Sequence, residues 1–250
     1  MARPSHDVPM PLTAHLEELR SRLIVSIVAI LVTAILGFIL ADQIIAVLKM
    51  PAGGITLHVF SPLDGFFVKW RIALFAGLAL ASPIWLHQLI AFVTPGLTDD
   101  ERRVVLPLIG AGFVLFALGV TFGYYLLFGM INVLIAMFGP QLDYFPSADA
   151  YISFVIFFLL STGIAFELPV LLYGLVRLHV LSTERLRRQR RYFYFAMFVF
   201  AEIITPVSDP IVAPLTITVP LVVLYELTLI IARLGERQRD RSLLERNSSS

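Results

Sequence analysis

Long apolar stretches alternate with arginine-rich connectors along this chain of 250 residues. A helix of about 20 apolar residues crosses the roughly 30 Å of hydrocarbon in a bilayer. In lipid only helices and closed barrels satisfy their own backbone hydrogen bonds, and these stretches have the length of helices. The pattern predicts an all-α membrane protein with six transmembrane helices, at about 23–41, 72–94, 107–138, 151–176, 192–206 and 213–232.

The basic residues indicate how these helices are oriented. If the N-terminus faces the cytoplasm and all six helices cross, 16 of the 19 Lys and Arg residues lie inside, and only Lys49, Lys69 and Arg71 lie outside. Cytoplasmic loops are enriched in Lys and Arg, so we expect both termini inside (N-in, C-in). Hydrophobic residues make up 58% of the chain and the mean hydropathy is +0.85, which excludes an ordinary soluble domain.

The chain divides into one membrane domain and two short tails. Residues 1–22 form a cytoplasmic lead-in, where leucines at helical spacing indicate a short amphipathic helix. Residues 23–232 form the six-span domain, in which the last two spans are short. The highly charged residues 233–250 form a cytoplasmic tail that we expect to be disordered.

A long outer loop, residues 42–71, joins the first two spans. Pro51 and the following Gly53 and Gly54 interrupt it. Ser61-Pro62 has the pattern of a helix cap and first turn. Aromatic residues then recur at helical spacing, so we expect a short helix over 60–70 at the outer headgroup level.

A carboxylate within the fourth span is the first candidate for chemistry. Glu167 lies in the run Phe166-Glu167-Leu168-Pro169, deep in an apolar stretch. Because an ionised carboxylate in hydrocarbon costs several kcal/mol, its side chain must face protein or water. Glu167 is therefore either a functional polar site inside a cavity, or a protonated or paired structural residue.

Acidic residues also accompany the arginines on the predicted cytoplasmic side. Glu17 and Glu18 precede the first span, and Asp99, Asp100 and Glu101 lie between the second and third. These acids either balance the charge of neighbouring arginines or recognise a cationic ligand. A guanidinium pairs with a carboxylate through two parallel hydrogen bonds, which suits a peptide that carries arginine.

Four polar residues near the last helical hairpin form a third candidate site: Glu202, Thr205, Asp209 and Glu226. They either cap helices and reach toward the interface, or form a docking surface for another transmembrane helix. An interhelical hydrogen bond in lipid contributes about 0.6–2 kcal/mol, so a polar partner helix would gain from such a surface.

Motifs typical of enzymes are missing from the sequence. It contains no G-x-S-x-G, no H-E-x-x-H and no Walker A run. It has no cysteine, which excludes disulfides, thiol nucleophiles and Cys-ligated zinc. We therefore expect no enzymatic activity, no metal and no cofactor. The basic run at 185–191 is interpreted as a topology signal and a contact for anionic lipid rather than a nucleic-acid site.

Taken together and in order, the motifs of this chain resemble the TatC family, the receptor subunit of the twin-arginine protein translocase. The resemblance covers about residues 12–233. It rests on His15-Leu16-Glu17-Glu18-Leu19-Arg20-Ser21-Arg22, Ser61-Pro62 before Phe66 and Lys69, Ala81-Ser82-Pro83 followed by Gln88, Phe92, Pro95-Gly96-Leu97 and Glu101-Arg102, Phe122-Gly123-Tyr124, Phe166-Glu167-Leu168-Pro169, Arg191-Tyr192, Thr205-Pro206 with Asp209-Pro210, and Pro220 with Leu224-Tyr225-Glu226.

This resemblance implies a cupped, glove-like helix bundle in a bacterial inner membrane and a function in protein transport driven by the proton-motive force. TatC-like proteins bind signal peptides that carry an Arg-Arg pair on folded cargo. Carried over, Glu18 and Glu101 would receive the two arginines, and Arg20, Phe92 and Leu97 match other positions of the recognition area. Glu167 matches the carboxylate on the concave face. Pro51, Ser61 and Pro62 match the outer cap.

The resemblance also implies partners. TatC-like proteins assemble into oligomeric complexes with TatA- and TatB-type proteins, which dock near the fifth and sixth spans where Thr205 lies. This chain departs from the usual pattern there, because Ile211-Val212-Ala213 replaces the family's Ser-Gln and Glu202 replaces an apolar or small residue. Our hypothesis is that Glu202 takes over as hydrogen-bond partner. The alternative function is a proton-coupled secondary transporter or channel that uses Glu167.

Overall fold

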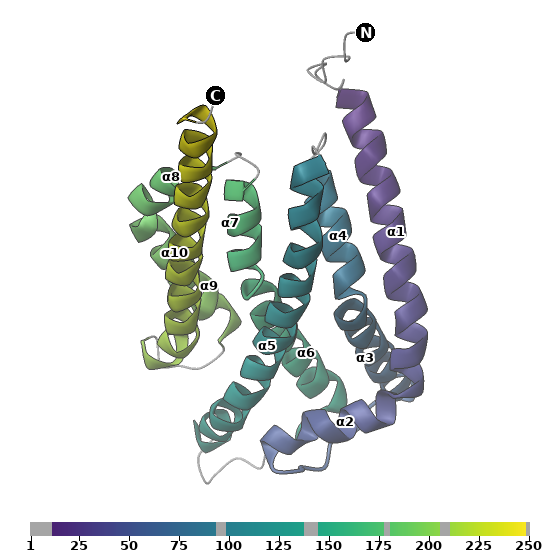
Figure 1. Ribbon diagram of the computed structural model, residues 1–250. Coiled ribbons are helices and arrows are strands. Elements are labelled where there is room, and N and C mark those ends of the chain that lie inside the picture. Colours follow the sequence, from purple (N-terminus) through teal and green to yellow (C-terminus); the bar gives the residue numbers. More distant parts are fainter. Residues whose placement is uncertain (1–11, 94–98, 138–144, 178–180, 206–210, 249–250) are drawn as a thin grey trace. The chain divides into compact units, whose positions relative to one another are not determined.

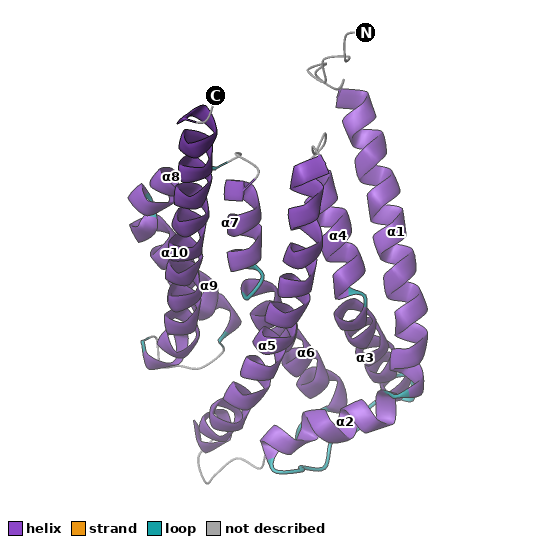
Figure 2. Ribbon diagram, viewed as in Figure 1, coloured by secondary structure: helices purple, strands orange, loops and turns teal. Residues whose placement is uncertain are grey.

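The computed structural model describes residues 12–93, 99–137, 145–177, 181–205 and 211–248. Side chains are described for 13–92, 107–136, 145–177, 181–205, 211 and 213–236. Every regular element in these ranges is a helix, which confirms the predicted all-α class (Figure 2). The helices are α1 (Leu12–Ile39), α2 (Ala41–Lys49), α3 (Asp64–Leu80), α4 (Ser82–Val93), α5 (Asp99–Met137), α6 (Ala148–Ala165), α7 (Leu168–Arg177), α8 (Thr183–Arg188), α9 (Arg190–Ile204) and α10 (Val212–Ser248), with a 3₁₀ turn at Met50–Ala52 (Figure 1).

The chain forms two compact units. Unit 1 holds α1 to α4 with the first parts of α5 and α6, and unit 2 holds the rest of α5 and α6 with α7 to α10. Both units contain helices that are long and apolar enough to cross a membrane. Four described helices or helix pairs have this length and composition, or five if the bent pair α3–α4 is one span. The number of six spans stays a prediction, because α9 has only 15 residues.

Close backbone contact joins α1 to α3 in unit 1. A Cβ added to Gly77 would lie 2.6 Å from the carbonyl oxygen of Ile30, and one added to Gly37 would lie 2.9 Å from that of Ala73. The Thr33 hydroxyl lies 2.8 Å from the carbonyl oxygen of Gly77 on the neighbouring helix. Small residues at such an interface let two helices approach closely enough for dispersion and polar contacts to hold them together in lipid.

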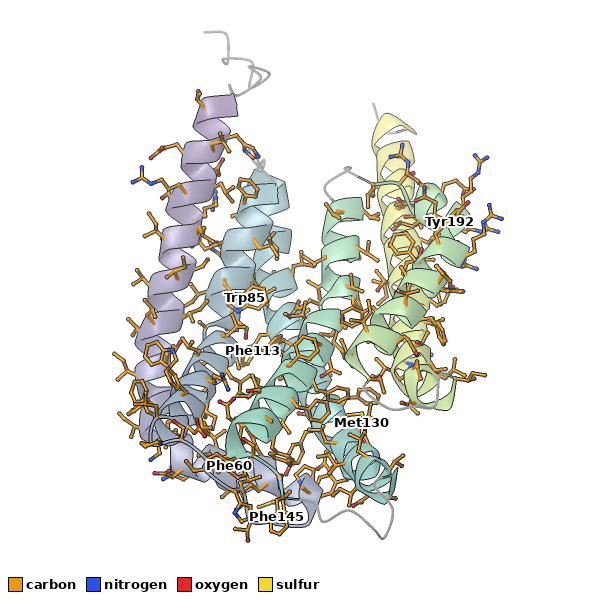
Figure 3. All side chains as sticks on the ribbon, turned by 180° about the vertical axis from the view of Figure 1, so that it is seen from behind. Phe60, Trp85, Phe113, Met130, Phe145 and Tyr192 are labelled. Carbon is orange, nitrogen blue, oxygen red and sulfur yellow. The ribbon has the colours of Figure 1, made fainter. Side chains whose placement is uncertain are left out.

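The predicted second span is not one straight helix over 72–94. The structure starts α3 earlier, at Asp64, and breaks the span at Ala81, where α3 and α4 are bent by 59°. Pro83 has no N–H, so it leaves the Ala79 carbonyl without its helical donor. The Ser82 hydroxyl donates to that carbonyl at 2.7 Å, and the Trp85 indole N–H donates to the Leu78 carbonyl at 3.0 Å (Figure 3 labels Trp85). Two side chains thus stabilise the bend.

The start of α3 merges the expected outer helix with the span that follows. The Asp64 carboxylate accepts the N–H of Ser61 at 2.9 Å, and the Ser61 hydroxyl accepts the N–H of Leu63 at 3.4 Å. The side chains of Ser61 and Asp64 thus bind backbone N–H groups of the turn that leads into α3. The segment 60–70 therefore begins the membrane helix and does not form a separate interface helix.

The outer connector contains more helix than the sequence suggested. Residues 42–71 were expected as a loop, but α2 occupies its first part. Gly53 and Gly54 have φ angles of 70° and 72°, a left-handed conformation that glycine adopts without a Cβ clash. Beyond this turn, His58 exchanges backbone hydrogen bonds with Pro146 and Ala148 at 3.0 and 2.8 Å.

Glycines also set the packing of α5 on α6 in unit 2. A Cβ added to Gly119 would lie 2.7 Å from the Thr162 carbonyl oxygen, and one added to Gly163 would lie 2.9 Å from the Phe116 ring. The predicted fourth span, 151–176, is the pair α6 and α7, interrupted at Phe166 and Glu167. Ala148–Arg177 still qualifies as one candidate span.

The expectation of a disordered tail after residue 232 is wrong for the backbone, since α10 continues to Ser248. Arg, Leu, Glu and Gln dominate this stretch, and all are good helix formers. A helix already formed in the apolar part of α10 extends at little cost, because the unfavourable nucleation step is complete.

Replacing Gly77 by Ala tests the contact between α1 and α3. The added methyl group would meet backbone atoms, which side-chain rotation cannot relieve, so we expect a loss of about 1–3 kcal/mol and a lower melting temperature in detergent. Gly65→Ala on the same helix is the control, because nothing lies within 4 Å of its added Cβ. It should keep or raise the melting temperature. Equal melting temperatures for the two variants would contradict this packing.

Candidate functional site

The start of α1 carries the first predicted site residue, Glu18. Its carboxylate oxygen Oε1 accepts two hydrogen bonds from one guanidinium group, at 2.9 Å from Arg22 Nε and 2.6 Å from Arg22 Nη2. The two residues are four apart, which places them on one face of the helix. Both side chains are about three-quarters buried, with 22% of Glu18 and 26% of Arg22 exposed. This pair is therefore shielded from solvent more than most surface ion pairs.

Helix α4 contributes two more residues to the same place in unit 1. Arg22 Nη1 donates to Gln88 Oε1 at 3.3 Å, so the guanidinium lies between α1 and α4. His15, one turn before Glu18, stacks on Phe92 with ring centroids 4.5 Å apart and planes 14° from parallel. The bend at Ala81 directs α4 so that Gln88 and Phe92 meet α1. We call His15, Glu18, Arg22, Gln88 and Phe92 the inner cluster.

The second oxygen of Glu18 is the unusual feature of the inner cluster. Oε2 is buried, and no described group donates a hydrogen bond to it. His15 Nδ1 lies 4.0 Å away, beyond hydrogen-bond distance. A carboxylate can accept about four hydrogen bonds, and a buried acceptor left without one costs about 1–3 kcal/mol. With respect to the described residues, Glu18 therefore keeps unused capacity for a cationic donor.

The other predicted recognition residues are placed differently. Arg20 lies on the exposed side of α1 and pairs with Glu17 at 3.4 Å, so it is not part of the inner cluster. Leu97 lies outside the described residues. Glu101 lies in the first turn of α5 in unit 1, but its side chain is outside the described part. The structure thus places Glu18 and Phe92 on either side of His15 in one cluster, and the signal-peptide-binding role of all five predicted residues stays a prediction.

Glu167 lies at the break between α6 and α7. Its backbone N–H bonds three residues back, to the Ile164 carbonyl at 3.0 Å, and Pro169 offers no N–H to the Ala165 carbonyl. The side chain is 2% exposed, and neither carboxylate oxygen has a hydrogen bond from any described group. The described part of the chain therefore does not supply the ion-pair partner that a paired structural role requires.

Glu226 on α10 binds within its own unit. Its carboxylate accepts a hydrogen bond from the Tyr194 hydroxyl and lies 2.8 Å from Arg190 Nη2, and both partners come from α9. The neighbouring Tyr225 hydroxyl donates to the Leu186 carbonyl at 2.8 Å. These contacts tie α8, α9 and α10 together, so the Glu226 carboxylate has an internal role beside the predicted docking role.

The remaining docking candidates differ in exposure. Glu202 is exposed beside Ile203, which is 70% exposed, and it has no hydrogen bond to any described residue. Thr205 is buried, and its hydroxyl donates back to the Ala201 carbonyl at 2.7 Å. Asp209 lies outside the described residues. On the face of α9, Glu202 is therefore the carboxylate that is open to a partner.

The outer-cap residues have local structural contacts. Pro51 is buried in the 3₁₀ turn, and the adjacent Leu48 carbonyl accepts the Tyr151 hydroxyl at 2.8 Å. Ser61 and Pro62 form the turn that leads into α3. Among the described residues no group of three or more His, Cys, Asp or Glu side chains could hold a metal ion.

These features define a class of protein: a multi-pass helical membrane protein with carboxylates held between helices. The family model described as Sec-independent protein translocase protein (TatC) matches residues 14–220. The chain belongs to this family, whose members are components of the Tat protein translocase and not enzymes. It therefore functions in protein transport as part of a Tat translocase complex. The family match thus favours a translocase subunit over the alternative of a proton-coupled transporter or channel.

Individual relatives agree with the family match. TatC of Frankia casuarinae is 36% identical over 94% of this chain and 69% of its own length, and TatC of Aquifex aeolicus is 36% identical over 92% and 98%. TatC of Deinococcus radiodurans is 38% identical over 89% and 86%. A crystal structure of the twin-arginine translocase receptor TatC in DDM has a TM-score of 0.74 and 34% identity, covering 87% of this chain and 99% of that one.

Several contact residues were not among the predicted site residues. His15, Arg22 and Gln88 complete the inner cluster, and Arg190 and Tyr194 hold Glu226. Spacing offered a signal for Arg22 and His15, which lie four and three residues from Glu18 on one helix. Gln88, Arg190 and Tyr194 come from other helices, so only the tertiary structure reveals them.

Replacing Glu167 by Gln separates a structural role from a functional one. Because no described group pairs with this buried carboxylate, removing its charge should keep or raise the melting temperature in detergent. Cargo transport in membrane vesicles should fall if the carboxylate is functional. Glu184→Gln, an exposed residue in the same unit, is the control and should change neither quantity. A clear drop in melting temperature for Glu167→Gln would contradict the absence of a stabilising partner.

Proposed function

We propose that this chain is the subunit that recognises Arg-Arg signal peptides of folded cargo at the cytoplasmic face and nucleates the translocation complex. In this proposal Glu18 and Glu101 each receive one guanidinium group of the arginine pair. Phe92, Leu97 and Arg20 contribute to the surrounding recognition area. One crystallised relative is described as a twin-arginine translocase receptor, which supports the same role here.

The observation that carries the proposal is the state of the Glu18 carboxylate. It is partly buried between α1 and α4, where a guanidinium already binds its Oε1, while Oε2 has no hydrogen bond from a described group. Such a site suits an arginine side chain because charge-assisted hydrogen bonds are strong when they are partly shielded from water. The α1 start and the α5 start, which bears Glu101, lie toward the same end of unit 1 (Figure 1).

Glu17 provides a matched control for the test of this site. Glu18→Gln and Glu101→Gln should each weaken binding of an Arg-Arg signal peptide by about tenfold or more, the effect of one charge-assisted hydrogen bond of about 1.5–3 kcal/mol. Glu17→Gln removes the same charge one residue away, at a side chain that is 73% exposed, and should bind as the wild type does. Binding is measured by pull-down from detergent, with a Lys-Lys peptide in parallel.

Two results would overturn the receptor proposal. The first is equal recovery of the Arg-Arg and Lys-Lys peptides by the wild-type chain. The second is the same loss of binding for Glu17→Gln as for Glu18→Gln, since this would indicate general electrostatic attraction and not a defined carboxylate site.

We further propose that TatA- and TatB-type single-span proteins dock on α9 in a bacterial inner membrane. Glu202 supports this because it is exposed on a face that also carries Phe195 and Ile203, 69% and 70% exposed. An exposed carboxylate on an apolar face is costly in lipid, and a polar group on a partner helix would offset that cost. Thr205 and Asp209 lie near the end of the same helix in sequence, and the proton-motive force would drive the assembled complex.

Site-specific photocrosslinking tests the docking proposal. A photoreactive residue at position 203, beside Glu202, should crosslink to a TatA- or TatB-type helix, and Glu202→Leu should reduce that yield severalfold. A probe at Val219, exposed on α10, is the comparison position. Adducts confined to lipid at position 203, while the partner still co-purifies, would count against docking at Glu202.

A further inference from the structure

We propose that Glu18 and Gln88 together form a guanidinium site between α1 and α4, and that Arg22 is its resident competitor. In this view a signal-peptide arginine enters by displacing Arg22, and Gln88 is the residue that distinguishes guanidinium from ammonium. The inference rests on the proposed receptor function and adds a specificity residue to it.

The geometry of Arg22 shows that the site fits a guanidinium. All three nitrogens of its guanidinium group find acceptors, which lie on two different helices. Nε and Nη2 donate to Glu18 Oε1 at 2.9 and 2.6 Å, and Nη1 donates to Gln88 Oε1 at 3.3 Å. The acceptors therefore lie on separate edges of one planar group. A planar guanidinium group can bind both acceptors at once, because its N–H donors are fixed relative to one another.

Access to Glu18 explains why displacement is needed. Oε1 is occupied by Arg22, and Oε2 is buried with His15 Nδ1 4.0 Å away. An incoming side chain must move one of these groups before it reaches the carboxylate. Arg22 lies on the same helix as Glu18 and pairs with it at the i,i+4 spacing, an interaction of modest strength that a second guanidinium can replace.

The exchange is selective because of Gln88. When a signal-peptide arginine displaces Arg22, Arg22 loses its contacts with Glu18 and Gln88, and the peptide arginine makes the same contacts. The free-energy change of this exchange is therefore small. When a signal-peptide lysine displaces Arg22, its compact ammonium group reaches Glu18 but does not span both Glu18 and Gln88. The Gln88 contact is then lost without replacement. The difference equals about one hydrogen bond between a charged and a neutral group.

Two variants separate competition from selectivity. Arg22→Gln removes the competitor and should tighten binding of both an Arg-Arg and a Lys-Lys peptide by the same factor, about two- to fivefold. Gln88→Met removes the second acceptor and should lower the ratio of the Lys-Lys to the Arg-Arg dissociation constant by about three- to tenfold. Both are measured by fluorescence anisotropy with the purified full-length chain in detergent.

Controls match each change in charge and chemistry. Arg187→Gln removes the same charge at an exposed residue of α8, outside the inner cluster and the recognition area, and should leave both constants unchanged. Gln43→Met makes the Gln88 substitution on an exposed residue of α2 and should leave the ratio unchanged. In a Glu18→Gln background, Arg22→Gln should have no further effect, because the residue for which Arg22 competes is absent.

The outcomes separate this inference from the proposed function. If the wild type does not distinguish the peptides, or if Glu18→Gln binds like the wild type, the receptor proposal itself fails. If both hold but Arg22→Gln weakens binding, Arg22 positions Glu18 and does not compete for it, which overturns the inference. An unchanged ratio for Gln88→Met, at an unchanged melting temperature, also overturns it.

Discussion

Backbone hydrogen bonding inside hydrocarbon governs how this chain is built, because each N–H and C=O there needs a partner within the protein. Where the sequence interrupts a helix, other groups must take over. At Ala81 the Ser82 hydroxyl and the Trp85 indole bind the carbonyls of Ala79 and Leu78, so the chain bends by 59° and continues as α4. That bend presents Gln88 and Phe92 to α1. The geometry of the inner cluster thus depends on the hydrogen bonds that the backbone carbonyls receive at the bend between α3 and α4.

Three buried or partly buried carboxylates in the described part of the chain differ in their partners. Glu226 is paired with Arg190 and Tyr194 and holds helices together. Glu167 is buried with no described partner, at a point where the helix itself is irregular. Glu18 is between these cases, with one oxygen bound and the other not. Because unpaired charge is costly in a low-dielectric environment, Glu167 and Glu18 are the shielded acids for which a functional partner is expected, in addition to the exposed Glu202 on α9.

Much of the fold could be predicted from the sequence, because apolar length and the distribution of arginine follow directly from the bilayer. The all-helical class was accessible in this way, whereas the binding role of Glu18 in the His15–Arg22 segment rested on the family resemblance and stays a prediction. The bend at Ala81 was harder, since Ser82-Pro83 signals a break but does not reveal that Trp85 stabilises it. The helical tail was missed because charge favoured disorder while propensity favoured helix. Gln88 lies far in sequence from its partner Arg22, and Tyr194 lies far from Glu226, so no spacing rule could assign them.

The central claim is that the arginine pair of a signal peptide binds at the beginning of α1 beside α4. The most direct measurement is photocrosslinking with a signal peptide that carries a benzophenone next to its Arg-Arg pair, followed by mass spectrometry of the adducts. The account predicts adducts on residues adjoining His15, Glu18 and Phe92, which an excess of unlabelled Arg-Arg peptide prevents. Adducts that map instead to α9 or α10, and that this competitor suppresses equally well, would contradict it.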